Sequence, residues 1–166
     1  EGLIELVAHR GAYVRTVARS DMHDILAVLE RLATLAAGLA AERIGEADHR
    51  ARFQAALDRV LQFRAHPEGT ALMQARTDFY DTLVQIGGNR ELARSMPLIR
   101  IHLMRMQFRQ MTLVASSHHF FDEYDAVAAA VLAGDTRRAE SAMRRHLRRT
   151  RARLDRLPDS LFADAD

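Results

Sequence analysis

The chain has 166 residues, 48% of them hydrophobic, and its 24 basic and 22 acidic residues leave a net charge of +2. This length suits one domain with a sizeable core, and no apolar run is long enough to span a membrane. The absence of cysteine excludes disulfides and thiolate zinc sites, and so small a net charge does not by itself indicate nucleic acid as a partner.

Residues 1–17 differ from the rest of the chain because they contain two β-rich runs. The runs are residues 3–7 and 12–17, and His9, Arg10 and Gly11 lie between them. This pattern predicts a β-hairpin with a basic tip, which needs a larger body to pack against. Because the chain starts with Glu rather than Met, we expect that a preceding segment is missing.

From Ser20 onward the apolar spacing predicts helices throughout. The first runs from Ser20 or Asp21 to about Arg43, where Gly45 follows. The second covers about 46–65 and the third about 68–86, before a glycine-rich break. The residues expected to point inward are Ile25, Leu29, Leu32, Leu35, Ala36, Leu39, Phe53, Leu57, Val60, Leu61, Leu72, Phe79, Leu83 and Ile86.

A further helix is predicted in the middle of the chain. A short helical turn over residues 90–96 precedes Pro97, which starts a helix to about Val114. This helix is apolar on several sides, which is typical of a position at the centre of a bundle. Ser116 or Ser117 is expected to cap the helix that follows.

Residues 120–149 predict two antiparallel helices, each with a buried stripe. Gly134 ends the first helix and Asp135 caps the second. Tyr124 and His146 lie on the two stripes and are expected to face the same interior, where polar groups need partners. The stripes consist of Phe120, Tyr124, Val127 and Val131, and of Ala139, Met143 and His146.

Other polar residues can border the same interior. Arg76 and Tyr80 lie four residues apart beside an apolar stripe, and His102, Arg105 and Arg109 share one flank of the predicted central helix. A guanidinium presents a planar fork that matches a carboxylate, so these residues predict a site for an anionic ligand. In the alternative interpretation each arginine points outward or pairs with a nearby acid.

The last predicted helix is rich in arginine. Its only acidic residues are Glu140 and Asp155. The pattern indicates either a solvated face or an anionic partner, such as nucleic acid or an anionic effector. The arginines are Arg137, Arg138, Arg144, Arg145, Arg148, Arg149, Arg151, Arg153 and Arg156.

Metal-ligand and catalytic patterns are weak. Glu46 with His49, and His119 with Glu123, are each spaced for one helix face but lie at helix starts, where solvated side chains are expected. There is no glycine-rich phosphate loop and no nucleophile with an obvious base, so nothing argues for an enzyme. The predicted fold is all-α, an antiparallel bundle of six to seven helices preceded by the short hairpin.

The sequence resembles a bacterial regulator family over nearly its whole length. Residues 1–15 resemble the final wing of the winged helix-turn-helix in GntR-type transcription regulators. The remainder resembles the all-helical effector-binding domain of the FadR subgroup, called the FCD domain. The resemblance assigns 1–17 to the wing and 18–160 to the helical domain. The supporting stretches are residues 29–41, 79–83, 88–89 and 130–135, with His146.

This resemblance implies a cytoplasmic, homodimeric transcription regulator whose helical domain binds a small metabolite, often an organic acid. It implies that His9, Arg10 and Gly11 contact the DNA backbone, while the recognition helix is absent from this chain. The alternative, from another class, is a helical-bundle enzyme or small-molecule carrier without a role on DNA.

Many members of the resembled family hold a divalent metal through an Asp, a His four residues later and two further His. Aligned on the glycine turns, these positions are Arg76, Tyr80, Tyr124 and His146. An arginine would repel a cation, and neutral tyrosines are poor ligands for divalent ions at pH 7. We therefore expect no bound metal or other cofactor, and an effector carboxylate held directly by Arg76.

Overall fold

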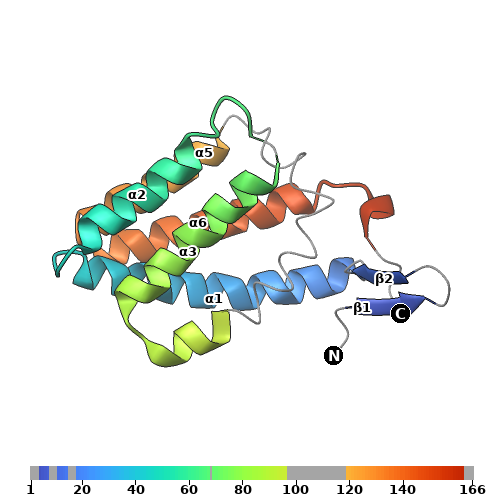
Figure 1. Ribbon diagram of the computed structural model, residues 1–166, viewed down its shortest axis with the longest axis horizontal. Coiled ribbons are helices and arrows are strands. Elements are labelled where there is room, and N and C mark those ends of the chain that lie inside the picture. The colour runs from blue at the N-terminus through green and yellow to red at the C-terminus, as the bar shows by residue number, and fades with distance from the viewer. Residues whose placement is uncertain (1–3, 8–10, 15–17, 68, 97–118, 163–166) are drawn as a thin grey trace.

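The computed structural model describes residues 4–7, 11–14, 18–67, 69–96 and 119–162 (Figure 1). Strand β1 (Ile4–Val7) pairs antiparallel with β2 (Gly11–Val14), so that Ile4 lies opposite Val14 and Val7 opposite Gly11. The two strands precede the helices, as the sequence predicts. Of the expected hairpin tip, only Gly11 is among the described residues, and it starts β2.

The remaining described elements are helical. They are α1 (Arg19–Arg43), α2 (His49–Leu61), α3 (Thr70–Gly87), α5 (Phe120–Leu132), α6 (Thr136–Leu154) and a 3₁₀ turn (Asp159–Leu161). Residues 90–96 are helical as well. The all-helical prediction is thus confirmed for this part of the chain, whereas the predicted central helix, 97–114, lies outside the described residues. None of the described helices is long and apolar enough to cross a membrane.

Helix α1 contacts α3, α5 and α6, and it runs along the whole bundle in Figure 1. Small buried residues, among them Ala33, Ala37 and Ala40, let the neighbouring helices approach its backbone closely. Gly87 of α3, for example, lies against Ala40. The prediction that Leu35 points inward is wrong: its side chain is 42% exposed, because the alanine face turns it toward the outside.

Several helix boundaries differ from the sequence prediction. Helix α2 begins at His49 rather than near 46, because a turn follows α1 and Ala47 has a φ of 43°. It ends at Leu61 rather than near 65, where tighter backbone bonds take over, such as Phe63 N–H to Val60 O. Helix α5 begins at Phe120, later than a cap at residue 116 or 117 would place it.

The turn between α5 and α6 forms as the sequence predicts. Gly134 has a φ of 71°, and its N–H donates to Val131 O, which ends α5. The side chain of Asp135 accepts from Arg138 N–H at 2.9 Å and caps α6. The end of α5 and the start of α6 are therefore held in a fixed geometry, with the apolar stripes of the two helices turned toward each other.

Replacement of this cap tests its contribution to stability. We expect Asp135→Ala to lower the free energy of unfolding by about 1 kcal/mol, because an N–H group in the first turn of α6 loses its acceptor. Asp135→Asn is the matched control, since it retains an acceptor oxygen and should remain close to wild type. Urea unfolding of both variants measures the difference, and equal losses would contradict a capping role.

Candidate functional site

Four polar side chains from three helices meet in the core. Arg76 and Tyr80 come from α3, Tyr124 from α5 and His146 from α6. Arg76 Nε donates to Tyr124 Oη at 2.7 Å, and Tyr80 Oη lies 2.8 Å from His146 Nε2. The rings of Tyr124 and His146 are 4.9 Å apart. The structure therefore brings together the residues that the sequence placed around one interior.

Aromatic rings surround these polar groups. Phe79 lies 5.0 Å and Phe120 lies 5.4 Å from the Tyr124 ring, both edge to face. The guanidinium of Arg76 also lies over the Phe120 ring, 5.2 Å from its centre, in a cation–π contact. Arg76 is only 5% exposed, so its charge is held inside the protein by these rings and hydrogen bonds. Such packing fixes the polar side chains in place.

Glu123 completes the cluster, and the expectation of a solvated Glu123 is wrong. Its side chain is buried, and Oε2 lies 2.9 Å from His146 Nδ1. Arg153 binds the same carboxylate with two N–H groups, each at 2.8 Å. Glu123 is buried because this fork from α6 neutralises it, and neither its spacing from His119 nor its place near a helix start reveals that partner. We call Arg76, Tyr80, Glu123, Tyr124, His146 and Arg153 the core polar cluster.

The protonation states in the core polar cluster follow from burial and hydrogen bonds. Burial lowers the pKa of His146, although Glu123 opposes the shift, so His146 is neutral at pH 7. Burial also raises the pKa of Tyr80 well above 10, and the phenol keeps its proton. Burial favours a neutral Glu123, but hydrogen bonds from Arg153 and His146 outweigh it and hold its pKa at about 2.

These states set the direction of each hydrogen bond. Since Glu123 is ionised, it accepts from the Nδ1–H of His146. The unprotonated Nε2 of His146 then accepts from the Tyr80 hydroxyl. A chain of hydrogen bonds therefore runs from Arg153 through Glu123 and His146 to Tyr80, and every link has one donor and one acceptor.

The same shifts predict loss of stability in acid. The unfolded chain binds a proton at His146 more readily than the folded one, so stability falls as pH drops through about 6.5. Glu123 adds a second loss as pH falls from 4.5 toward its folded pKa of about 2. Urea unfolding at a series of pH values measures both. In His146→Gln the loss between about pH 7 and pH 5 should become smaller, and an unchanged profile would contradict this assignment.

Residues 24–149 match the family model described as the FCD domain. The chain belongs to the FCD domain family. Two solved structures share the fold of this FCD domain. E. coli McbR/YncC matches with a TM-score of 0.75 at 15% identity, over 90% of this chain and 75% of that one. The crystal structure of a putative transcriptional regulator GntR from Rhodococcus sp. RHA1 matches with a TM-score of 0.71 at 18% identity, over 95% and 75%. No curated protein matches the chain by sequence.

The donor set of this FCD domain does not fit the divalent metal that the family resemblance implies. Of the four aligned positions only His146 is an ordinary metal ligand, and both of its ring nitrogens are engaged in hydrogen bonds. Arg76 adds a positive charge beside it, and Tyr80 stays protonated. Among the described residues, no group of three or more His, Cys, Asp or Glu is arranged to hold a metal ion.

The other candidate residues either lie outside the described residues or are found at the surface. Those from the central helix, namely His102, Arg105 and Arg109, lie outside the described residues, as do His9 and Arg10. His119 is exposed and contacts Asp122 instead of joining Glu123 in a site. His49 Nδ1 lies 2.8 Å from the backbone oxygen of Arg43, while Glu46 pairs with the Arg43 side chain, in keeping with the surface position expected for both.

Proposed function

We propose that this FCD domain is the effector-binding and dimerisation part of a GntR-type bacterial transcription regulator. The match of the FCD model to residues 24–149 carries the proposal. Within the domain, the proposal is supported by the core polar cluster, because binding sites in helical bundles are commonly built from polar side chains enclosed among apolar ones. One of the two similar structures is itself titled a putative transcriptional regulator.

The chemistry of the core polar cluster favours an organic acid as the effector. Arg76 provides a buried positive charge at the position where the resembled family has a carboxylate. A guanidinium in a dry, aromatic setting binds a carboxylate more strongly than one in water. Within the cluster Tyr80 is only partly buried, and its hydroxyl can exchange His146 for a ligand oxygen. His102, Arg105 and Arg109 are proposed to complete the site.

The proposed regulator acts on DNA through a segment before residue 1 together with the hairpin. In this proposal β1 and β2 form the wing, and His9, Arg10 and Gly11 contact the DNA backbone. Effector binding would favour one arrangement of the two DNA-binding lobes in a homodimer, which is a shift of population rather than a chemical reaction. The proposed role therefore involves no enzymatic reaction.

A thermal-shift screen against organic acids, sugar acids and acyl thioesters tests the proposal. An acid that binds the site should raise the melting temperature of the wild-type chain, because a ligand that binds only the folded state stabilises that state. The shift should be lost in Arg76→Ala and in His146→Ala. An acid that shifts both variants as much as wild type would refute the site.

A further inference from the structure

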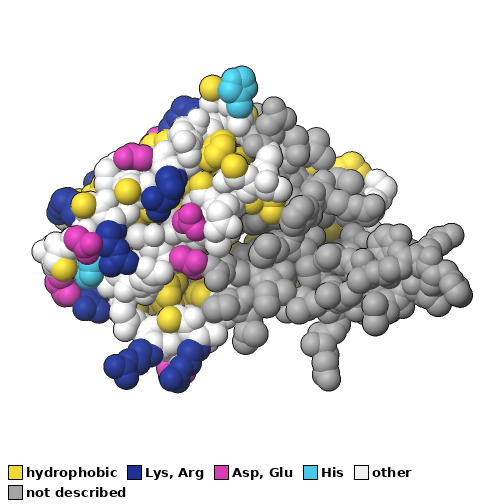
Figure 2. Space-filling model, in the orientation of Figure 1, with side chains coloured by type: hydrophobic (Ala, Val, Ile, Leu, Met, Phe, Trp, Pro, Cys, Tyr) yellow, Lys and Arg dark blue, Asp and Glu magenta, His cyan; other side chains and the backbone are white. Residues whose placement is uncertain are grey.

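A second feature lies on the outer face of α6 and meets the core polar cluster only at its C-terminal end, where Arg149 approaches Glu123. Helix α6 carries eight of the 24 arginines and one of the 22 acidic residues. The rest of the chain is therefore net negative, with 16 arginines against 21 acidic residues. On the face shown in Figure 2, arginine and acidic side chains lie interspersed. The excess of positive charge in this protein therefore lies on α6.

Six of the eight arginines of α6 share one side of the helix. At 100° per residue these six fall within an arc of about 140°, and the buried residues of α6 occupy the opposite side. Glu140 lies outside that arc and packs against Gly38 of α1. We call this surface the arginine face; it consists of Arg137, Arg138, Arg144, Arg145, Arg148 and Arg149.

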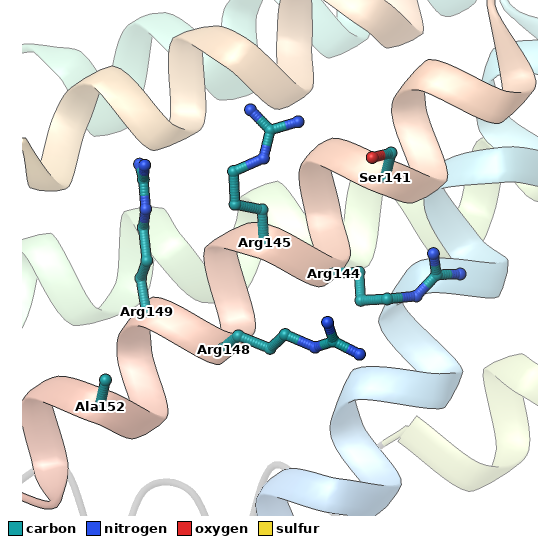
Figure 3. Close-up of a pocket in the computed structure, with 6 residues that line it drawn as sticks. All are labelled: Ser141, Arg144, Arg145, Arg148, Arg149 and Ala152. Atoms are coloured by element: carbon teal, nitrogen blue, oxygen red, sulfur yellow. The ribbon is translucent and has the colours of Figure 1, made fainter.

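The arginine face is only weakly neutralised. Arg148 lies 3.4 Å from Glu30, and Arg149 lies 3.7 Å from Glu123, whose carboxylate already binds Arg153. The other four arginines have no ion pair with any described residue. Figure 3 shows the side chains of Arg144, Arg145, Arg148 and Arg149 spread from the helix instead of converging on one point.

Two adjoining hollows follow this face. The first, of about 380 Å³, is lined by Arg144, Arg145, Arg148 and Arg149, with Ser141 and Ala152 at its ends. The second, of about 400 Å³, shares Arg149 and Ala152 with the first and is also lined by Arg153, Arg156, His119 and the carboxylate of Glu123, which Arg153 neutralises. A track along a helix in which arginines outnumber the one carboxylate fits an extended polyanion better than a compact ligand.

We propose that the arginine face binds the phosphate backbone of duplex DNA without reading its sequence. The face spans about 18 Å from Arg137 to Arg149, over which one DNA strand presents about five phosphates. Guanidinium groups bind phosphates through paired N–H donors. The choice of duplex DNA rests on the proposed regulator function, since such a protein works beside the duplex. The arginine face would then add affinity to the contacts made by the DNA-binding lobes.

Binding of the 166-residue chain to a labelled random duplex of about 20 base pairs, at about 50 to 200 mM salt, tests this proposal. The wild-type chain should bind with an affinity that falls steeply with salt. Arg144→Gln/Arg145→Gln should bind roughly tenfold more weakly at low salt, with a salt slope shallower by about 1 for each arginine removed. Arg90→Gln/Arg94→Gln is the matched control: it removes the same charge from exposed positions elsewhere and should retain the wild-type slope.

Three results would overturn the proposal. The first is that the wild-type chain does not bind the duplex, and the second is that the two double variants have equal salt slopes. The third is that the chain binds inorganic triphosphate or anionic vesicles but not duplex DNA. The thermal shift by an organic acid is a separate readout. If DNA binding fails while that shift persists, the arginine face is refuted and the effector site is not; the reverse pattern refutes only the effector site.

Discussion

Replacement of Glu123 by alanine is expected to lower the free energy of unfolding by about 3–5 kcal/mol. The carboxylate is buried, and it is the shared acceptor of His146 and Arg153. Its removal leaves the Arg153 guanidinium, which is only 15% exposed, without its neutralising partner. It also removes the acceptor of His146 Nδ1–H. A buried donor without an acceptor costs more than the lost bond alone.

The neighbouring Asp122 offers a matched control in the same turn of α5. Its carboxylate pairs with Arg64 at 2.7 Å, but both side chains are about half exposed. Asp122→Ala should therefore cost no more than about 1 kcal/mol. Thermal unfolding should show a decrease of roughly 10 °C for Glu123→Ala and a small one for Asp122→Ala. Similar decreases in the two variants would contradict the structural role assigned to Glu123.

The second large effect is expected on ligand binding by Arg76→Lys. Lysine keeps the positive charge but loses the planar fork and the N–H that binds Tyr124. For an organic acid held by two parallel hydrogen bonds, we expect a loss of about 2 kcal/mol or more, or roughly 30-fold in affinity. Calorimetric titration with the acid that gives the largest thermal shift measures this.

Two comparisons make the Arg76 result interpretable. Arg52→Lys is the matched control, because Arg52 is an exposed residue of α2 that binds Gln85 at the surface, and its affinity for the acid should be unchanged. Circular dichroism establishes whether the Arg76 variant is folded. A folded Arg76→Lys protein that binds the acid as tightly as wild type would show that the guanidinium does not hold the ligand.

Much of the fold could be predicted from local signals in the sequence. The stripe of α5 and that of α6 are buried as their spacing predicts, and Asp135 caps α6. Such features depend on residues one or two turns apart, so periodicity and capping rules apply to them directly. Helix ends were predicted less well where an irregular turn, rather than a glycine or a proline, marks the boundary. The start of α2 at His49, after the turn at Ala47, is one such case.

The candidate site was predicted in part. Arg76, Tyr80, Tyr124 and His146 meet as expected, because each lies on or beside an apolar stripe. Glu123 and Arg153 were not assigned to the site, since their pairing joins residues 30 positions apart on different helices. One signal was available for Glu123: it lies three residues after Phe120 and four before Val127, on the buried side of α5.

The exposed position of Leu35 has a related cause. Its spacing fits an inward face of α1, but small residues such as Ala33 and Ala37 form the contact surface instead. A pattern of large apolar residues alone does not distinguish these two faces. The choice depends on how closely the neighbouring helices approach, which is a property of the packed bundle.

The central claim is that the core polar cluster works as a hydrogen-bonded anion site in place of a metal centre. The metal content of the purified wild-type chain, measured by elemental analysis without prior chelation, tests this claim most directly. We expect no divalent ion at a stoichiometric level, because Arg76 and the engaged nitrogens of His146 oppose one. One tightly bound divalent ion per chain that disappears in His146→Ala would contradict it.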